Sequence, residues 1–349
     1  MKTLRLTVDP THIDTPEATD ALDRAAAILR TGGLVALPTE TVYGLGANAL
    51  DPEAVARIFA AKERPHWDPV IVHIANLDQL EGLVTSIPAA ARRLMEAYWP
   101  GPMTLLLPRT TEVPDAVTSG RALVGIRMPA HPVALELIRR AGVPVAAPSA
   151  NLFSHTSPTT AAHVLADLDG RIDAVLDAGP ARHGVESTVL DPTQEPIIVY
   201  RPGAVTIEEI RTVAGPAEFF EPAENIQETP KEALPSPGIG IRHYAPRARL
   251  VLIEAALDEL AGKLAEEAQK YPNQHLGLML PEELKVPAAL QSAELHRWGR
   301  WAEPATLARD LYAGLRALDE RNCDVILCPL PAVEGIGAAI RDRLGKAAR

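Results

Sequence analysis

The stretch LPTETVYGLGANAL, Leu37 to Leu50, sets the pattern for the first half of the chain. It follows an apolar run typical of a strand, and it gathers hydroxyls, a carboxylate, a tyrosine and two glycines before a helix that Asp51 caps. Taken alone, it fits an ordinary strand-to-helix connection, with glycines that supply positive φ angles, as well as it fits a functional turn. The spacing of Gly44 and Gly46 matches neither a dinucleotide fingerprint nor a Walker loop. The pattern therefore predicts a strand, a polar turn and a helix.

Further strand and helix patterns surround this stretch. A helix is predicted to begin at Pro16, with Thr15 as its cap, and to end at Gly32. A capping box of Thr206 and Glu209 predicts another helix, the last of this domain. Apolar runs predict strands at 34–37, 70–74, 103–107, 122–127, 143–147, 174–178, 188–190 and 197–200, and further helices at 51–62, 131–141 and 157–168. Because strands outnumber helices without strict alternation, we expect an α+β fold with a mixed sheet.

The chain divides into two domains joined by a linker. From 214 to 246 periodicity gives way to Pro, Glu and Gly. After it, apolar runs alternate with amphipathic helices, which predicts a small Rossmann-like α/β domain with a mostly parallel sheet. We therefore assign 1–213 to a first domain, 214–246 to the linker and 247–349 to the second domain.

Composition narrows the class of protein. The chain has 349 residues, of which 47% are hydrophobic, and it contains no apolar run long enough to span a membrane and no signal-peptide pattern. We expect a soluble cytoplasmic protein. The net charge of −11 argues against a surface that wraps nucleic acid, although it permits a local basic pocket. Cys323 and Cys328 are expected to be buried thiols rather than a disulfide or a metal pair.

A basic turn follows the helix at 51–62. Lys62 and Arg64 stand at the end of this helix, where cations are favourable through the helix dipole alone. Pro65 stops the helix directly after them, as an anion pocket would require, because Arg and Lys together bind phosphate well. His73 lies on the next strand, where a histidine satisfied within the core is the usual interpretation. Both interpretations of this region remain open.

Arg127 closes an apolar strand, where an unpaired charge would be costly. A substrate carboxylate would be a suitable partner, and so would an internal Glu.

Hydroxyl-rich turns follow other strands. Ser149 and Asn151 lie in one such turn, and Ser157 with Pro158 resembles a helix N-cap, which would offer free N–H groups to a phosphate. Simple capping explains Ser157 equally well. Ser187 lies in a similar turn, and Arg201 follows the strand at 197–200. Cations and hydroxyls without a metal cluster, a nucleophile elbow or a Cys–His pair favour electrostatic stabilisation of phosphoryl chemistry over covalent catalysis.

The order of these motifs resembles one family. The chain carries PTETVYGLG, KERP with a further proline four residues on, WPGPMTLLL, RMPAHP, PSAN, ESTVLD and YRPGA. In this order they resemble the two-domain form of L-threonylcarbamoyladenylate synthase, whose catalytic domain is YrdC-like. The resemblance covers about residues 10 to 212, and the linker and second domain continue it to the end of the chain.

The resemblance implies a reaction and a set of site residues. L-threonine, bicarbonate or CO2, and ATP would become threonylcarbamoyl-AMP and pyrophosphate, with Mg2+ carried by ATP. The product would pass to the complex that transfers the threonylcarbamoyl group to tRNA. The family's catalytic fold is a twisted mixed sheet. Carried over by position, Lys62 and Arg64 would be the catalytic cations, L-threonine would be bound by Thr41, His73, Arg127, Ala147 and Ser187, and ATP would be bound by Arg64, Asp68, Leu123, Ser149, Ser157, Arg201 and Tyr244.

The chain departs from the family's usual pattern in three places. Asp68 stands where many members have Asn, so its carboxylate would face Mg2+ or only its backbone would take part. Ala147 replaces a small hydroxyl residue and leaves only its backbone to contact the substrate. Phe153 and Ser154 replace a more usual Ser-Gly pair, so the resemblance does not determine the path of that loop.

The linker raises a question of its own. Its last part, SPGIGIRHYAP, carries Arg242, His243 and Tyr244 after two glycines that give hinge freedom, Gly238 and Gly240. A plain tether between domains is one interpretation. The resemblance favours a lid that folds over the site, excludes water from an unstable carbamate and brings Tyr244 to the nucleotide.

Two other functions compete. A concave basic surface of this kind of domain suits an RNA-binding module, but the net charge opposes it, so we expect direct tRNA binding to be weak or absent. A carbamoyltransferase of the hydrogenase-maturation kind shares this domain, but it adds zinc-binding cysteine motifs that are missing from this sequence.

Overall fold

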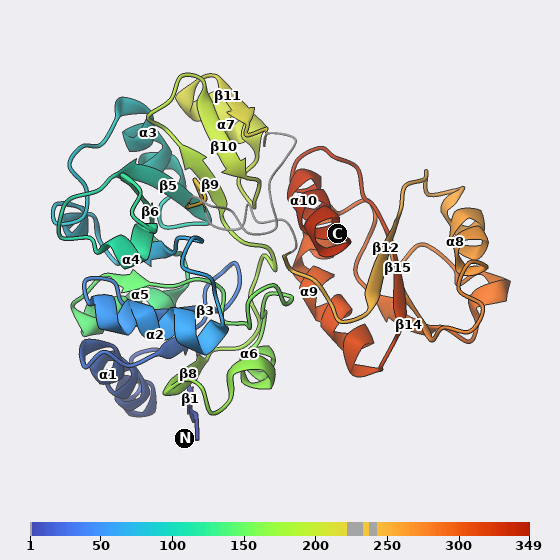
Figure 1. The fold of residues 1–349 in the computed structure, drawn as a ribbon, viewed down its shortest axis with the longest axis horizontal. Helices are drawn as coiled ribbons and strands as arrows, with labels where there is room; N and C mark the ends of the chain where they lie inside the picture. Colours follow the sequence, from blue (N-terminus) through green and yellow to red (C-terminus); the bar gives the residue numbers. More distant parts are fainter. Residues whose placement is uncertain (1, 222–232, 237–242) are drawn as a thin grey trace. The chain divides into compact units, whose positions relative to one another are not determined.

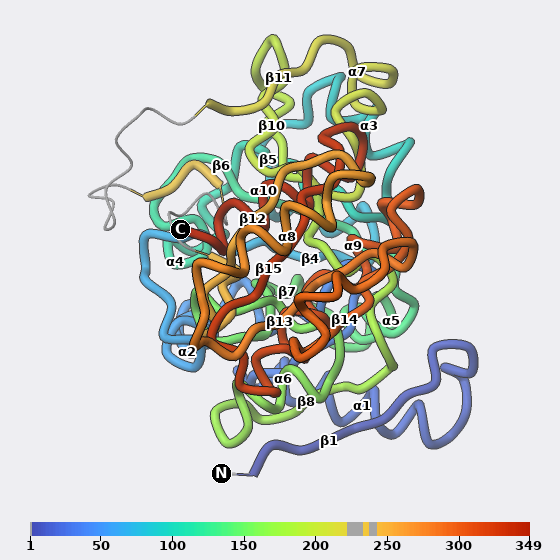
Figure 2. The backbone as a smooth tube through the Cα atoms, turned by 90° about the vertical axis from the view of Figure 1, so that its right-hand side faces the viewer, coloured from blue at the N-terminus to red at the C-terminus, as the bar shows by residue number. Residues whose placement is uncertain are grey.

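The computed structural model describes residues 2–221, 233–236 and 243–349 (Figures 1 and 2). The chain forms two compact units, and each is described by itself. The first holds Met1–Phe153, Ser157–Arg182 and Glu186–Gly240, and the second holds Ser154–Thr156, His183–Val185 and Ile241–Arg349. Gly238, Gly240 and Arg242, which were predicted to serve the lid, lie outside the described residues.

The described part of the first unit is built on one mixed sheet, as the strand patterns predicted. Its strands follow the order β1-β8-β2-β3-β7-β4-β6-β5-β9-β10-β11. In Figure 1, β1 and β8 lie together, and the two strands pair in parallel. The strands are β1 (Leu4–Thr7), β2 (Val35–Leu37), β3 (Gly44–Asn48), β4 (Ile71–His73), β5 (Met103–Pro108), β6 (Leu123–Arg127), β7 (Val145–Ala146), β8 (Ala174–Asp177), β9 (Thr188–Asp191), β10 (Ile197–Arg201) and β11 (Ala217–Phe219).

The helices begin where the predicted caps place them. Thr15 caps α1, Asp51 caps α2, and Thr206 with Glu209 forms the capping box of α7. In each case a side-chain oxygen accepts a hydrogen bond from a backbone N–H that the helix leaves unpaired. The helices are α1 (Pro16–Arg30), α2 (Pro52–Lys62), α3 (Ala89–Tyr98), α4 (Asp115–Thr118), α5 (Pro132–Ala141), α6 (Ala161–Leu168) and α7 (Ile207–Ala214), with the 3-10 turn η1 (Leu77–Leu80).

The stretch from Leu37 to Leu50 is a hairpin rather than a plain strand-to-helix connection. Gly44–Asn48 forms β3, which pairs antiparallel with β2. A Cβ on Gly46 would lie 2.8 Å from both Leu37 Cδ2 and Val145 Cγ1, so close packing requires the glycine here. Of the two interpretations left open for this stretch, the ordinary connection with glycines at positive φ does not hold, because neither Gly44 nor Gly46 has a positive φ.

The sheet extends into the predicted linker. Ala217–Phe219, inside the range 214–246, forms β11 and pairs in parallel with β10. The Pro- and Glu-rich composition hides this strand, because only three residues take part and two of them are exposed.

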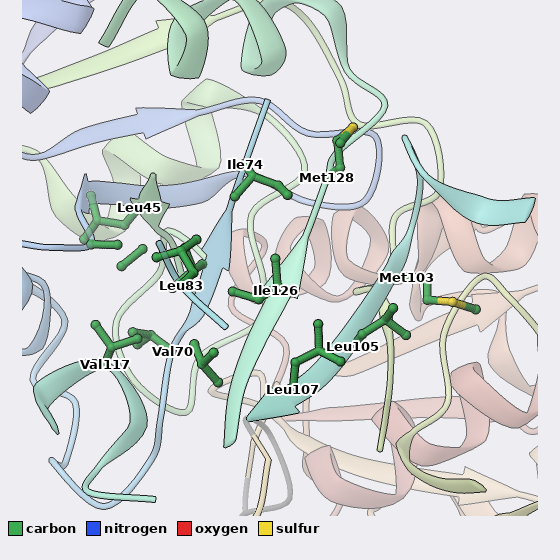
Figure 3. Close-up of a cluster of buried hydrophobic side chains, with 14 of the residues drawn as sticks. Leu45, Val70, Ile74, Leu83, Met103, Leu105, Leu107, Val117, Ile126 and Met128 are labelled. Carbon is green, nitrogen blue, oxygen red and sulfur yellow. The ribbon is translucent and has the colours of Figure 1, made fainter. Parts of the chain in front are cut away.

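Alternate side chains of the central strands point to two different environments. On the face that we call the core face, Val72 of β4, Leu105 of β5 and Ile126 of β6 join one large hydrophobic cluster, part of which is drawn in Figure 3. Helices α2, α3, α6 and α7 supply buried residues to the same cluster. On the opposite face, α1 and α5 pack over β1, β8, β2 and β7. From β4 onward that opposite face bears His73, Thr104 and Arg127, and we call this part the site face.

The described part of the second unit contains a four-stranded, wholly parallel sheet in the order β12-β15-β13-β14, as its alternating pattern predicted. It buries Leu278 and Leu327 beneath α8, whose Leu260 and Leu264 face them. Cys323 and Cys328 are free, buried thiols. The elements are β12 (Arg249–Ile253), α8 (Leu260–Ala268), β13 (Leu276–Leu280), η2 (Ala288–Leu290), β14 (Glu294–Arg297), α9 (Pro304–Glu320), β15 (Val325–Pro329) and α10 (Gly337–Ala347).

Within the described ranges, every helix is too short or too polar to cross a membrane.

Candidate active site

Arg127 is the centre of the site face. Its Nη2 donates to Glu40 Oε1 at 2.7 Å, and its Nη1 donates to Thr41 Oγ1 at 2.9 Å. Its Nε donates to the carbonyl of Gly101 at 3.2 Å. Of the two partners left open by the sequence, the structure shows the internal Glu. These bonds use three of the five guanidinium N–H groups, which leaves two donors for a further partner.

The Glu40 carboxylate is buried but ionised. Burial alone would raise its pKa, but the charge and hydrogen bonds of Arg127, with the backbone N–H groups of Glu40 and Ala130, hold the pKa below its ordinary value. Glu40 comes from the β2–β3 hairpin and Arg127 from the end of β6, so the pair joins distant parts of the chain. It is a buried ion pair. Removing either partner strongly destabilises the folded protein, because the other partner is left as an unpaired buried charge.

His73 stands beside Arg127 on the neighbouring strand, because the two are register partners in the parallel pair β4–β6. Burial, and then the Arg127 charge, lower the pKa of His73 to about 3. The ring is therefore neutral at physiological pH and offers a hydrogen-bonding nitrogen rather than a charge. Thr41 is buried on the other side of Arg127, and its Oγ1 lies 2.8 Å from that of Thr39.

A second polar group continues the site face toward β9 and β10. Thr104 precedes Leu105, the register partner of Ile126, so it lies on the same face as Arg127, and its Oγ1 lies 2.8 Å from Ser187 Oγ. Arg201 Nη2 donates to the same Ser187 Oγ at 3.0 Å, and its Nε donates to the Ser187 carbonyl at 3.1 Å. Ser187, predicted for the threonine site, therefore touches Arg201, predicted for the nucleotide site. The two predicted subsites adjoin at this serine.

Lys62 is fully buried at the end of α2. Its Nζ donates to the carbonyls of Ser149 and Asn151, each at 2.5 Å, so it joins the helix to the PSAN turn instead of capping its own helix. Burial, and then the nearby Arg64 charge, lower its pKa well below the ordinary value. An anion bound here would raise the pKa of Lys62 again, because a negative charge favours the protonated amine.

Arg64 and Asp68 form a compact buried pair. Arg64 Nη2 lies 2.8 Å from Asp68 Oδ2, and its Nε donates to the Asp68 carbonyl at 3.0 Å. Its guanidinium also lies over the Phe153 ring, 5.9 Å from the centroid. The Asp68 side chain, unexpected beside a triphosphate, thus holds Arg64 in place.

Ser157 does not cap a helix. Helix α6 begins at Ala161, and Thr160 is the N-cap, since its side chain accepts from His163 N. Ser157 is fully buried and its Oγ donates to Glu186 Oε1 at 2.5 Å. The predicted cap was wrong because a residue distant in sequence offers this hydroxyl a stronger, charged acceptor.

An apolar strip adjoins the polar groups on the site face. Ile71, Leu106 and Val189 are buried in it, and Leu123 and Tyr200 pack against them. Ala147 borders the strip, and its N–H donates to the Ile71 carbonyl at 2.8 Å. Leu123, predicted for the ATP site, and Ala147, predicted for the threonine site, therefore both lie next to this strip.

Tyr244 belongs to the second unit. It is buried there, with its ring 5.9 Å from that of Tyr312 and with the Arg343 guanidinium 5.2 Å from its centroid. Its part in nucleotide binding stays a prediction.

Sequence reasoning missed three acidic or hydroxyl side chains of the site: Glu40, Thr104 and Glu186. Glu40 was inside the quoted stretch, and a buried Arg without a nearby acid was the signal that such a residue exists. Thr104 interrupts the apolar run MTLLL, and Glu186 opens the motif ESTVLD. A polar residue inside an apolar strand was the available signal for Thr104.

Comparisons with known proteins cover both units. A family profile described as telomere recombination, of the Sua5, YciO and YrdC proteins, matches residues 27–203. A profile for the C-terminal domain of threonylcarbamoyl-AMP synthase matches residues 205–349.

Full-length relatives agree with these profiles. The threonylcarbamoyl-AMP synthase of Bacillus subtilis is 44% identical, over 100% of this chain and 98% of its own length. That of Pyrococcus abyssi is 43% identical, over 93% of this chain and 92% of its own length. The crystal structure of the P. abyssi Sua5 protein in complex with L-threonine aligns with a TM-score of 0.88 and 38% identity, over 100% of this chain and 98% of that one.

Proposed function

The chain belongs to the threonylcarbamoyl-AMP synthase family, and on that premise we propose how its first unit makes threonylcarbamoyl-AMP. The enzyme condenses L-threonine, bicarbonate or CO2, and ATP, and it releases pyrophosphate. The observation that carries the assignment of roles is the site face, where buried arginines and hydroxyls adjoin a turn that is held by a buried lysine.

L-threonine is bound around Arg127. The two guanidinium N–H groups beyond its three internal bonds face the substrate carboxylate, and Thr41 and Ser187 supply hydroxyls on either side. Neutral His73 contacts the threonine side chain, and the Ala147 carbonyl completes the pocket. A neutral imidazole suits this position because a second cation beside Arg127 would be repelled.

ATP is bound between the basic turn and Arg201. Lys62, Arg64 and the Ser149 hydroxyl contact the phosphate oxygens, and Asp68 holds Arg64 in position. Ser157 takes part through its backbone N–H, because its hydroxyl donates to Glu186. The base lies on the apolar strip, beside Leu123. Lys62 and Arg64 are proposed to be the catalytic cations, because desolvated charges stabilise the negative charge that develops on leaving pyrophosphate.

The chemical step joins the two subsites. The threonine ammonium gives a proton to solvent, and the resulting amine adds to CO2 and gives a second proton to solvent, which leaves a carbamate. A carbamate oxygen attacks the α-phosphorus of ATP, the bond from that phosphorus to the bridging oxygen breaks, and pyrophosphate leaves with the electron pair. Holding the carbamate beside phosphorus and away from water supplies much of the acceleration. The contact between Ser187 and Arg201 supports this arrangement, because it brings the two substrates' sites together.

Mg2+ is proposed to arrive on the triphosphate. Groups of three or more His, Cys, Asp or Glu side chains that could hold a metal are not found among the described residues, so the donors would be phosphate oxygens and water. The chain's own cations would then act on the oxygens that the metal leaves exposed.

We also propose that residues 233–236, a described part of the linker, cover part of this site. Leu234 N donates to the Trp67 carbonyl at 2.9 Å, and Arg121 Nη1 donates to the Ala233 carbonyl at 2.6 Å. Trp67 precedes Asp68, and Arg121 lies near Leu123, so this part of the linker passes residues proposed for ATP. Leu234→Asp should therefore lower turnover, whereas Phe219→Asp, at an exposed position of β11, should not.

The product is proposed to pass to the complex that modifies tRNA, in the cytoplasm where ATP and tRNA are present. The net charge of −11 argues that tRNA itself binds weakly or not at all.

The test of the function is direct. The full chain is incubated with ATP, bicarbonate and labelled amino acids, and pyrophosphate and labelled adenylate are measured. We expect an adenylate that requires threonine and bicarbonate. Pyrophosphate release without threonine, or an adenylate lacking the label, would contradict the proposal.

A further inference from the structure

Unpaired buried polar atoms gather at one end of the site face. Among the described residues, Glu40 Oε2, His73 Nδ1 and His131 Nδ1 are buried and lack a partner in good hydrogen-bond geometry, although the backbone N–H groups of Glu40 and Ala130 lie close enough to lower the pKa of the carboxylate. A buried polar atom without a hydrogen bond costs folding free energy, and a charged one costs most, unless a ligand or a water molecule supplies the missing bond. Glu40 is the charged member of this group, and its side chain is only 7% exposed.

The three atoms belong to one neighbourhood around Arg127. Glu40 Oε1 lies 2.7 Å from Arg127 Nη2, so the other oxygen of the same carboxylate is close to the guanidinium as well. His73 is the register partner of Arg127 on β4. His131 is the residue before α5. Burial lowers the pKa of its ring, and the negative charge of Glu40 opposes that shift.

We propose that Glu40 Oε2 binds the α-ammonium group of the amino-acid substrate, so that Glu40 and Arg127 together hold the zwitterion. The inference rests on the proposed threonine site and adds the group that recognises the amine. One oxygen of the carboxylate fixes Arg127, which faces the substrate carboxylate, and the other fixes the ammonium. The spacing of a carboxylate and a guanidinium in contact matches the adjacent charges of an α-amino acid.

The electrostatics favour a binding role over proton abstraction. Arg127 and backbone N–H groups outweigh burial and keep the pKa of Glu40 below its ordinary value, and such a carboxylate attracts a cation but retains a proton poorly. His73 and His131 both have lowered pKa values because they are buried, so both rings are neutral near pH 7 and place no positive charge beside this oxygen. Within the described residues, Arg127 binds the other oxygen of the carboxylate, and Oε2 accepts from no side chain.

The competing explanation is that Glu40 only orients Arg127. The two explanations differ when the charge of the substrate changes. If Glu40 binds the ammonium, loss of its charge should matter only to a ligand that carries an ammonium. If it only orients Arg127, every ligand with a carboxylate should weaken by the same factor.

The experiment is calorimetric titration of the full chain with two ligands, L-threonine and its α-hydroxy analogue, in which a hydroxyl replaces the amino group. Glu40→Gln keeps the shape and an oxygen for Arg127 but removes the charge. We expect the wild type to prefer threonine by at least about tenfold, and E40Q to lose most of that preference while its affinity for the analogue changes by less than about threefold. Equal weakening of both ligands in E40Q would overturn the proposal.

Asp68→Asn is the matched control, because it removes the acidic partner of the other buried arginine of the site, Arg64. It should leave the preference for threonine over the analogue at the wild-type value. A preference lost in D68N as well would overturn the assignment to Glu40.

If E40Q does not fold, Glu40→Asp replaces it. Its shorter carboxylate reaches either Arg127 or the ammonium but not both, so the preference should fall by at least about threefold. An unchanged preference in E40D would overturn the proposal. These outcomes are distinct from failure of the proposed function, which would appear as a wild-type protein that forms no threonine-dependent adenylate.

Discussion

Arg64 and Arg127 are both buried and both paired with a carboxylate, but the two pairs are built differently. The partner of Arg64 is Asp68, four residues further along the chain, and both belong to the turn after α2. The partner of Arg127 is Glu40, which comes from another strand connection 87 residues away. The first pair can form within one segment, while the second exists only after the sheet has assembled. Arg64, which is proposed to bind ATP, is therefore held by its own segment of the chain. The threonine pocket around Arg127 depends instead on assembly of the whole fold.

Arg127→Ala should have the largest effect and separate the two pairs. It leaves Glu40 as an unpaired buried charge, which should cost about 3–5 kcal/mol in the free energy of unfolding. Threonine affinity should fall by about 2–4 kcal/mol, because the substrate carboxylate loses its partner, while ATP affinity is nearly kept. Urea unfolding and calorimetric titration measure the two effects.

Ile126→Ala is the control for that substitution, because Ile126 is the preceding residue and points to the core face (Figure 3). It should also destabilise the protein, by about 2–5 kcal/mol, but the folded fraction should bind threonine normally. Unchanged threonine affinity in R127A would show that Arg127 serves only Glu40.

Lys62→Ala and Arg64→Ala test the basic turn, whose two cations are proposed to act on ATP. Each should lower turnover by about a hundredfold to a thousandfold, since each removes a desolvated cation that stabilises leaving pyrophosphate. Threonine affinity should survive in both variants. Pyrophosphate release in steady state measures the loss, and normal turnover in either variant would reduce the basic turn to a structural junction.

Replacing the substrate threonine with the amino acid serine tests the pocket around Arg127 without a mutation. The two amino acids differ by one methyl group, which a pocket can recognise with only about 1–3 kcal/mol. Serine should therefore be a poor substrate, about 10–200-fold lower in kcat/KM, rather than a non-substrate. Equal rates with serine and threonine at low amino-acid concentration would show that Thr41 and His73 do not form the pocket for the threonine side chain.

His73 adds a pH dependence to the Arg127 side. Its pKa is about 3 in the folded protein, below the ordinary 6.5, so its stabilising contribution is complete above pH 6.5. As the pH falls below 6.5, the unfolded chain takes up a proton that the folded chain refuses, and the contribution declines by about 1.4 kcal/mol per pH unit toward pH 3. Urea unfolding between pH 6.5 and about 5 should show a decline of this sign, to which His131 and His296 add because their pKa values are lowered too, and His73→Asn should make the decline less steep.

Much of the fold was predictable from local signals. Thr15, Asp51 and Thr206 cap the predicted helices because capping depends on residues within one turn. The strands with continuous apolar runs were predicted for the same reason. Strand β3 was missed because Gly44 and Gly46 argue for a turn, and only the close approach of Leu37 and Val145 explains them. Ser157 was misread as a cap because its acceptor, Glu186, is distant in sequence.

The local parts of this protein could be predicted from the order of its residues: the caps, the apolar strands, the basic turn of Lys62 and Arg64, and, through the order of its motifs, the family. These depend on neighbours within a few residues, where covalent geometry limits the alternatives. Three features needed the folded chain: which carboxylate meets Arg127, which hydroxyl joins Ser187 to β5, and which face of each strand becomes the site. The pairing register sets all three, because a shift of one residue would exchange the core face for the site face.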